Sequence, residues 1–327
     1  MGMLGEFSHA PLRSLIEHGA QVCGVVIPRP ARGSLGPVTA EPCGSPIRRP
    51  LPTGTPRLAQ AATRLPNSLP VLPSPVAPNI VTLAEAQSIP VVEVARLSVP
   101  ETLTTLSGFH PDVICVACFP QVFPAALLAV PPLGCLNLHP SLLPAYRGPA
   151  PLFWQFRQGE TRTGVTIHFM DEGVDTGDIV LQRPVTLPDG ISGAEADRLC
   201  SEAGAELMVE AVQRLERDRR GCPRTKQPEE GISYYSWPAQ VDFRISTERP
   251  ARRAFNFMRG AAEWGVPFAI QVGDEPIRAR YAISFSPDEI LGAAWRQAGE
   301  QVWVQCAPGV LCATIARPVE PRDKSAV

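Results

Sequence analysis

The sequence has little lysine, almost no net charge and no long apolar run. Only 2 of its 327 residues are Lys, against 28 Arg, and the formal net charge is −2. This balance excludes a wholly basic nucleic-acid binder but allows a local basic patch. No stretch approaches the roughly 18 consecutive apolar residues of a membrane-spanning helix. The amino-terminal residues, with an acid at Glu6, do not resemble a signal peptide. We therefore expect a cytoplasmic protein without membrane contact.

The cysteines do not form a recognisable framework. There are nine, an odd number, scattered along the chain, which favours reduced thiols over disulfides. The one close pair, Cys115 and Cys118, lies in a run that is typical of a buried strand, where residues three apart point to opposite faces. Because no second pair completes a ligand set, we expect core packing at these residues and no bound metal.

The pattern along the chain predicts two domains. Strands alternate with helices over residues 1–205, which is typical of an α/β fold with a doubly wound, mostly parallel sheet. A Pro- and Arg-rich insertion at 28–78 interrupts this pattern with 13 prolines and six arginines. A linker helix and boundary are expected at 206–225. Several short strands over 226–327 predict a small antiparallel β-barrel of the OB-like kind.

The sequence pattern predicts the helices and strands of both domains, and in the first domain one strand ends at a polar motif. Helices are expected at 10–19, 81–87, 99–107, 124–130 and 193–217, and strands at 21–27, 91–94, 112–118, 135–139, 163–170 and 179–185. In the second domain, a helix is expected at 251–260 and strands at 241–245, 268–272, 277–283, 301–306 and 310–316.

The motif at the end of the 135–139 strand carries the first candidate chemistry. Asn137 and His139 are two residues apart, so both side chains project from one face of the strand. In open α/β sheets, ligands bind beyond the carboxyl ends of the strands. A later glycine-punctuated acidic loop contains Asp175 and could bring a carboxylate to the same edge.

An amide, an imidazole and a carboxylate suit acyl transfer. Asn137 could donate a hydrogen bond to an oxyanion, His139 could take the proton of an attacking amine, and Asp175 could orient the imidazole. No nucleophile elbow is present, which favours direct transfer over a covalent enzyme intermediate. On spacing alone, loop capping by these side chains is the competing interpretation.

Two longer segments resemble the 10-formyltetrahydrofolate-dependent formyltransferase family. They are NLHPSLLPAYRGPAP from Asn137 and TGVTIHFMDEGVDTGDIV from Thr163, and the resemblance covers about residues 85–215. It implies a formyltransferase-like Rossmann domain and a catalytic set of Asn137, His139 and Asp175. The stretch from 232 to 268 resembles the linker and small barrel of two kinds of family member, those that formylate methionyl-tRNA and formyltetrahydrofolate dehydrogenase.

The resemblance also implies two binding regions. The formyl donor, 10-formyltetrahydrofolate, is expected at the end of the 112–118 strand and at the acidic loop, with no metal; the residues concerned are Cys118, Phe119, Gly173, Val174 and Gly177. The acceptor is expected at the residues that follow the catalytic histidine, namely Ser141, Leu142, Leu143, Pro144, Arg147 and Gly148.

The acceptor amine is the open point of the sequence. Initiator methionyl-tRNA is favoured by the expected barrel and by the cationic insertion, since arginine is a usual phosphate contact. A small amine, such as an amino sugar nucleotide or a siderophore or peptide precursor, is favoured by Tyr146 and by the Phe153–Trp154 pair, where methionyl-tRNA enzymes usually differ. A non-catalytic binding module is disfavoured by the intact catalytic set. A monomer or weak dimer is expected.

Overall fold

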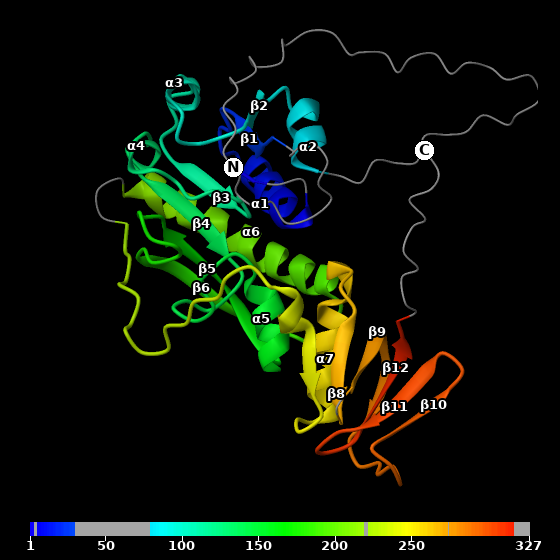
Figure 1. Ribbon diagram of the computed structural model, residues 1–327. Helices are drawn as coiled ribbons and strands as arrows, with labels where there is room; N and C mark the ends of the chain where they lie inside the picture. Colours follow the sequence, from blue (N-terminus) through cyan, green and yellow to red (C-terminus); the bar gives the residue numbers. More distant parts are fainter. Residues whose placement is uncertain (3–4, 30–78, 219–221, 274, 317–327) are drawn as a thin grey trace, which may run out of the picture. The chain divides into compact units, whose positions relative to one another are not determined.

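The computed structural model of the protein describes residues 1–2, 5–29, 79–218, 222–273 and 275–316 (Figure 1). From residue 30 onward, the predicted Pro- and Arg-rich insertion lies outside this part of the chain. Internal contacts divide the chain into two units. The first contains Met1–His139, Thr166–Gln182 and Ser201–Gln227, and the second contains Pro140–Val165, Arg183–Cys200 and Pro228–Val327.

The first unit begins with alternating helices and strands, as the sequence predicts. They are α1 (Glu6–Glu17), β1 (Val25–Pro28), α2 (Ile80–Ala86), β2 (Val91–Val94), α3 (Pro100–Ser107), β3 (Ile114–Ala117), α4 (Ala125–Leu128) and β4 (Cys135–His139). Three later elements contain residues of both units: β5 (Arg162–Phe169), β6 (Ile179–Thr186) and α6 (Gly193–Arg217). Helix α2 begins with a capping box, in which Asn79 and Thr82 satisfy each other's backbone N–H groups.

Strand pairing in the first unit is parallel except at β5. β1 pairs with β2 in parallel, and β3 pairs with β4 in parallel. The sheet order β3-β4-β5-β6 places β5 against β4, and that pair is antiparallel. The prediction of a mostly parallel sheet therefore holds for the Rossmann-like part, and the antiparallel direction of β5 was not predicted. An apolar strand does not reveal its direction in sequence, because either pairing buries the same side chains.

Residues 1–2 lie between the two groups of strands. The Gly2 N–H donates to the carbonyl of Val26 on β1 at 3.1 Å, and Gly2 forms a parallel bridge with Ala117 on β3. Beside this bridge is a cavity of about 580 Å³, lined in part by Val25 and Val116.

Apolar side chains cover β1 on both of its faces. Val26 belongs to a buried cluster with Leu106 of α3 and Leu127 of α4. Its neighbours Val25 and Ile27 belong to a second cluster on the opposite face, together with residues of α1 and α2. Because successive strand residues point to opposite faces, a strand buried this way is apolar throughout. This arrangement explains why the short strands are readable from the sequence.

The second unit combines a mostly antiparallel sheet with helices α5 (Pro151–Gln158) and α7 (Ala251–Gly260). The sheet order is β10-β11-β12-β9-β8-β7, and only β7 and β8 pair in parallel. The strands are β7 (Arg244–Ser246), β8 (Phe268–Val272), β9 (Glu275–Ser286), β10 (Trp295–Ala298), β11 (Gln301–Gln305) and β12 (Val310–Ile315). Within the described residues β7 and β10 remain edge strands, so the structure contains the predicted antiparallel sheet but not the closed barrel.

Three details of the second unit differ from the sequence-based predictions. The strand expected at 241–245 is a 3₁₀ turn, η1 (Gln240–Phe243), followed by β7, and a further 3₁₀ turn, η2 (Ala262–Trp264), follows α7. Helix α5, whose residues from Pro151 to Phe156 are all buried, was not predicted. Strand β10 was not predicted because all four of its residues are exposed.

An aromatic cluster forms the core of the second unit. Phe153 of α5 packs against Phe243, Phe257 and Trp264, with ring centroids between 5.0 and 5.5 Å apart. Aromatic pairs in these tilted and edge-to-face geometries each add about 0.5–1.5 kcal/mol beyond area burial. Phe153 is therefore a core residue.

Two chemical properties of the described residues bear on the sequence predictions. Their eight cysteines are all free thiols. No helix among them is long and apolar enough to cross a membrane.

Candidate active site

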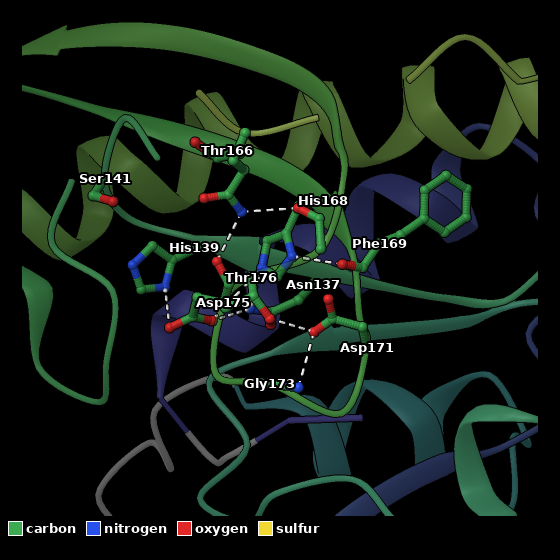
Figure 2. Close-up of polar contacts among 12 residues, drawn as sticks. Asn137, His139, Ser141, Thr166, His168, Phe169, Asp171, Gly173, Asp175 and Thr176 are labelled. Carbon is green, nitrogen blue, oxygen red and sulfur yellow. Dashed lines mark hydrogen bonds and ion pairs between the residues drawn. The ribbon is translucent and has the colours of Figure 1, made fainter. Parts of the chain in front are cut away.

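Strand register brings four polar side chains onto one face of β4 and β5. Asn137 is paired with His168 across the two strands, and His139 is paired with Thr166. Side chains directly opposite in an antiparallel pair lie on the same face of the sheet. On the other face, the buried Leu138 side chain of β4 packs against α6. A Cβ at Gly204 of that helix would lie 2.4 Å from Cδ1 of Leu138. The apolar residues fix the register, and the register places the polar group (Figure 2).

Asp175 completes this cluster from the loop between β5 and β6. Its Oδ2 lies 3.6 Å from Nδ1 of His139, and its Oδ1 lies 3.4 Å from Nδ2 of Asn137. Oδ1 is also 3.6 Å from Nε2 of His168. The structure thus brings together Asn137, His139 and Asp175, the three residues that the sequence singled out (Figure 2).

The cluster is shielded from solvent. The His139 side chain is 5% exposed and that of Asp175 is 12% exposed. Charges in such a place interact more strongly than in water, because the effective dielectric constant is lower. Asp175 contacts Nδ1 of His139, so its carboxylate would stabilise the imidazolium that forms when the ring gains a proton.

Hydrogen bonds within the acidic loop hold Asp175 in place. The Asp175 backbone is in the left-handed region, with φ +55°, which Asp and Asn tolerate better than most residues. Gln227 donates from Nε2 to the carbonyls of Asp175 and Gly177, both at 2.8 Å. Asp171 accepts from the N–H of Gly173 at 3.0 Å and from the hydroxyl of Thr176 at 2.5 Å. The carboxylate therefore lies on a backbone anchored at several points.

Neighbouring atoms within the loop leave little room for a side chain at either of its two glycines. A Cβ at Gly177 would lie 2.0 Å from the carbonyl oxygen of Phe169, and a Cβ at Gly173 would lie 2.1 Å from the Thr176 hydroxyl. Val174, between them, is exposed. Close approach of the Phe169 backbone thus requires glycine at Gly177, and the Thr176 side chain occupies the space at Gly173.

The predicted donor residues at the end of β3 have different environments. Cys118 is exposed and has φ +57°. Phe119 packs against the buried cluster that contains Val116, and its ring meets that of Phe123 edge to face at 6.0 Å. Of the two, Cys118 offers the accessible side chain.

The predicted acceptor residues belong to the second unit, where they form a tight loop. Ser141 is buried and donates from Oγ to the Ala145 carbonyl at 2.6 Å. Leu143 and Pro144 are buried, whereas Leu142 is exposed. Ser141, Leu143 and Pro144 thus support the loop, and Leu142 is the one of the four that faces solvent.

The backbone that follows this loop pairs with residues 233–235, which lie in the stretch that resembles the family's linker. Arg147 donates its N–H to the Ser233 carbonyl at 2.9 Å and accepts from the N–H of Tyr235 at 3.0 Å. Gly148 has φ +113°, and a Cβ there would lie 2.0 Å from the Tyr235 carbonyl oxygen. The glycine of the motif is therefore needed for close approach of the linker backbone.

Tyr146 and Trp154, which we interpreted from the sequence as favouring a small amine, both pack against Tyr235. Tyr146 stacks on Tyr235 with centroids 5.6 Å apart, and Trp154 stacks on Tyr235 at 4.7 Å. Burial, followed by the 2.6 Å hydrogen bond that Tyr146 donates to Glu160, raises the pKa of the Tyr146 hydroxyl. Trp154 is buried and donates to the Ser236 carbonyl at 2.9 Å. These two side chains thus have a structural explanation within the second unit.

Sequence reasoning missed two residues of the cluster. His168 lies opposite Asn137 only because β5 is antiparallel, and that direction was not predicted. The available signal was Thr166 and His168 two residues apart in an apolar strand, which places both on one face. Gln227 comes from a polar segment after α6, and nothing local in the sequence marks it.

Comparison with known proteins shows which family this chain belongs to. The family described as formyl transferase matches residues 72–212. A methionyl-tRNA formyltransferase of Citrifermentans bemidjiense is 35% identical over 240 residues, which are 72% of this chain and 73% of that protein. The chain belongs to the formyltransferase family.

Two further comparisons illustrate the range of similarity. A methionyl-tRNA formyltransferase of Syntrophus aciditrophicus is 42% identical over 200 residues, and the aligned region spans 57% of this chain but only 63% of that relative's length. An N-formyltransferase from Helicobacter canadensis, solved with folinic acid and dTDP-3-aminofucose, superposes with a TM-score of 0.61. That match covers 96% of this chain and 97% of the other at 13% identity, so it shows a shared fold.

Proposed function

We propose that this formyltransferase moves a formyl group from 10-formyltetrahydrofolate to the amino group of initiator methionyl-tRNA. The observation that carries the proposal is the placement of Asp175 against both His139 and Asn137, at 3.6 and 3.4 Å. The relatives named methionyl-tRNA formyltransferase at 35% and 42% identity support the choice of acceptor. A relative of that name implies a formyl-folate donor as well as the tRNA.

In the proposed reaction His139 carries one proton. The acceptor amine must lose a proton before its lone pair can attack the formyl carbon, and histidine titrates in the range where this is efficient. As the new C–N bond forms, negative charge develops on the formyl oxygen. When the intermediate collapses, the bond from carbon to the folate N10 breaks and N10 gains this proton from His139. The attacking nitrogen releases its second proton to solvent, so the products are a formamide, tetrahydrofolate and one proton.

Asn137 and Asp175 have complementary roles in this scheme. An amide N–H of Asn137 would donate to the developing oxyanion, a contribution of about 10²–10³ in rate for comparable donors. Asp175 would hold His139 by Nδ1, leaving Nε2 as the nitrogen that exchanges the proton, and would stabilise the imidazolium that forms.

The binding regions follow from the same proposal. The donor would lie at Cys118 and Phe119 and at the loop with Gly173, Val174 and Gly177. The exposure of Cys118 and Val174 supports this placement. The acceptor would meet the loop that follows His139, with Arg147 directed to phosphate and Leu142 to the apolar part of the substrate.

The structure weakens one argument for a small amine. Phe153 and Trp154 are buried and explained by core packing, so they give no support to an amino sugar acceptor. We therefore retain methionyl-tRNA and treat small amines as an outcome of the test.

Several further properties belong to this proposal. We propose domains at 1–205 and 226–327 joined at 206–225. A cytoplasmic location agrees with the free thiols of the described cysteines. We also propose a monomer or weak dimer.

An acceptor panel tests the proposed function. The purified full chain is incubated with 10-formyltetrahydrofolate and either methionyl-tRNA or a set of amino sugar nucleotides and simple amines, and formylated products are measured by mass spectrometry. We expect formyl-methionyl-tRNA, with affinity falling steeply as salt rises because phosphate contacts release counterions. Transfer to a small amine that is insensitive to salt would overturn the choice of acceptor.

A further inference from the structure

The proposed chemistry does not use two side chains of the active-site cluster, Thr166 and His168, and of these His168 contacts the Asn137 amide. His168 is buried on β5, directly opposite Asn137. Its Nε2 lies 3.1 Å from Nδ2 of Asn137, closer than any other side-chain contact of that amide in the structure (Figure 2). A buried imidazole this close to a proposed oxyanion donor must affect how the amide is held.

A backbone contact fixes the tautomer of His168. Its Nδ1 lies 2.7 Å from the carbonyl oxygen of Phe169. A carbonyl only accepts, so Nδ1 must carry the hydrogen. In a neutral ring Nε2 is then without a hydrogen and acts as an acceptor. The contact with Asn137 is therefore a bond that the amide donates and the ring accepts.

The same assignment fixes the orientation of the Asn137 amide. Nε2 of His168 and Oδ1 of Asp175 are 3.6 Å apart, and both are acceptors. Nδ2 of Asn137 lies 3.1 Å from the first and 3.4 Å from the second. Only the NH₂ group can satisfy both, because the amide oxygen would place a third acceptor there. A protonated His168 would instead set one N–H against another, so the neutral ring is part of the arrangement.

We infer that His168 is a positioning residue, which anchors one N–H of Asn137 so that the other is available to the oxyanion. The 3.1 Å bond to His168 is the anchor. The contact with Asp175 is longer, at 3.4 Å. The N–H in this contact leaves Asp175 and donates to the formyl oxygen when negative charge develops there. The inference rests on the proposed function, because it assigns the orientation of a proposed catalytic group.

Three variants at one position separate positioning from packing. His168→Gln keeps an N–H for the Phe169 carbonyl and an acceptor in the place of Nε2, since its amide nitrogen and oxygen have the same 1,3 relation as the ring nitrogens. His168→Asn keeps the N–H but does not reach Asn137, and His168→Leu keeps neither. His18→Leu, which removes an exposed histidine at the end of α1, is the control.

The expected kinetics follow from the lost anchor. We expect His168→Asn and His168→Leu to lower kcat by about tenfold or more, with both KM values changed by less than about threefold. His168→Gln should stay within about threefold of wild type, as should the control. Wild-type kcat in His168→Asn, or an equal loss in the Gln and Asn variants with folds intact by circular dichroism, would overturn the inference.

Nuclear magnetic resonance gives a readout that does not depend on formyl transfer. In wild-type protein carrying ¹⁵N-histidine at pH 7.5, we expect His168 to show a neutral ring with the hydrogen on Nδ1. A hydrogen on Nε2, or on both nitrogens, would contradict the anchor. If the wild type formylated no acceptor, the proposed function would fail, while the ring tautomer would still decide this inference.

Discussion

The substitution Asp175→Asn isolates the electrostatic part of the proposed mechanism. Asparagine keeps the shape of the side chain and tolerates the left-handed backbone of position 175, which has φ +55°. It removes the charge that lies 3.6 Å from Nδ1 of His139. It also lets the new amide nitrogen donate to Nδ1, which would favour the wrong tautomer of the ring. We expect turnover to fall and the fold to remain.

The distance gives the size of this effect. Two unit charges 3.6 Å apart interact by roughly 4–5 kcal/mol at an effective dielectric constant of about 20. That energy corresponds to about three orders of magnitude in rate, which is a ceiling because the imidazole carries full charge only after proton transfer. We therefore expect kcat to fall by about 10²–10³, with little change in the KM of the donor.

A control in the same loop makes the result interpretable. Asp171 accepts from the Gly173 N–H and from the Thr176 hydroxyl, and Asp171→Asn retains an oxygen that can accept both. The assay is single-turnover formylation followed by chromatography, with circular dichroism to establish the fold. A value of kcat for Asp175→Asn within threefold of wild type, in a folded protein, would refute the electrostatic role.

Four further predictions concern binding, thiol reactivity and stability. Cys23 and Cys118 are exposed, so both should react with iodoacetamide at pH 8, and a folate analogue should protect Cys118 alone; equal protection would argue against a donor site there. Burial raises the pKa of Cys135 to about 12, so its thiol should stay unlabelled at pH 8, as mass spectrometry can show. Gly148→Ala should lower the melting temperature by several degrees or more, because its Cβ would clash with the Tyr235 carbonyl; an unchanged melting temperature would contradict the close approach. Arg147→Ala should raise the acceptor KM far more than the donor KM, and equal effects would point to loop packing instead.

The sequence predicts the features that depend on local pattern. The apolar strand Cys135–His139 and the two-residue spacing of Asn137 and His139 are readable because a strand alternates its faces. The placement of Asp175 beside them came from resemblance, since no local rule brings a loop residue 38 positions away to a strand end. The geometry now gives that placement a physical basis in the anchored loop.

Features that depend on tertiary context were not predictable. The antiparallel direction of β5, which brings His168 to Asn137, leaves no mark in an apolar strand. The first six residues of helix α5 are all buried. Strand β10 has no buried face at all. In each case packing rather than local propensity decided the structure.

The most direct test of the account is single-turnover formylation of methionyl-tRNA by the wild-type chain and by His139→Ala, with 10-formyltetrahydrofolate as donor. We predict that the wild type forms formyl-methionyl-tRNA and that the variant, with its fold intact, is slower by about two orders of magnitude or more. Equal rates in the two proteins would contradict the role of His139, and no formyl-methionyl-tRNA from the wild type would contradict the proposed acceptor.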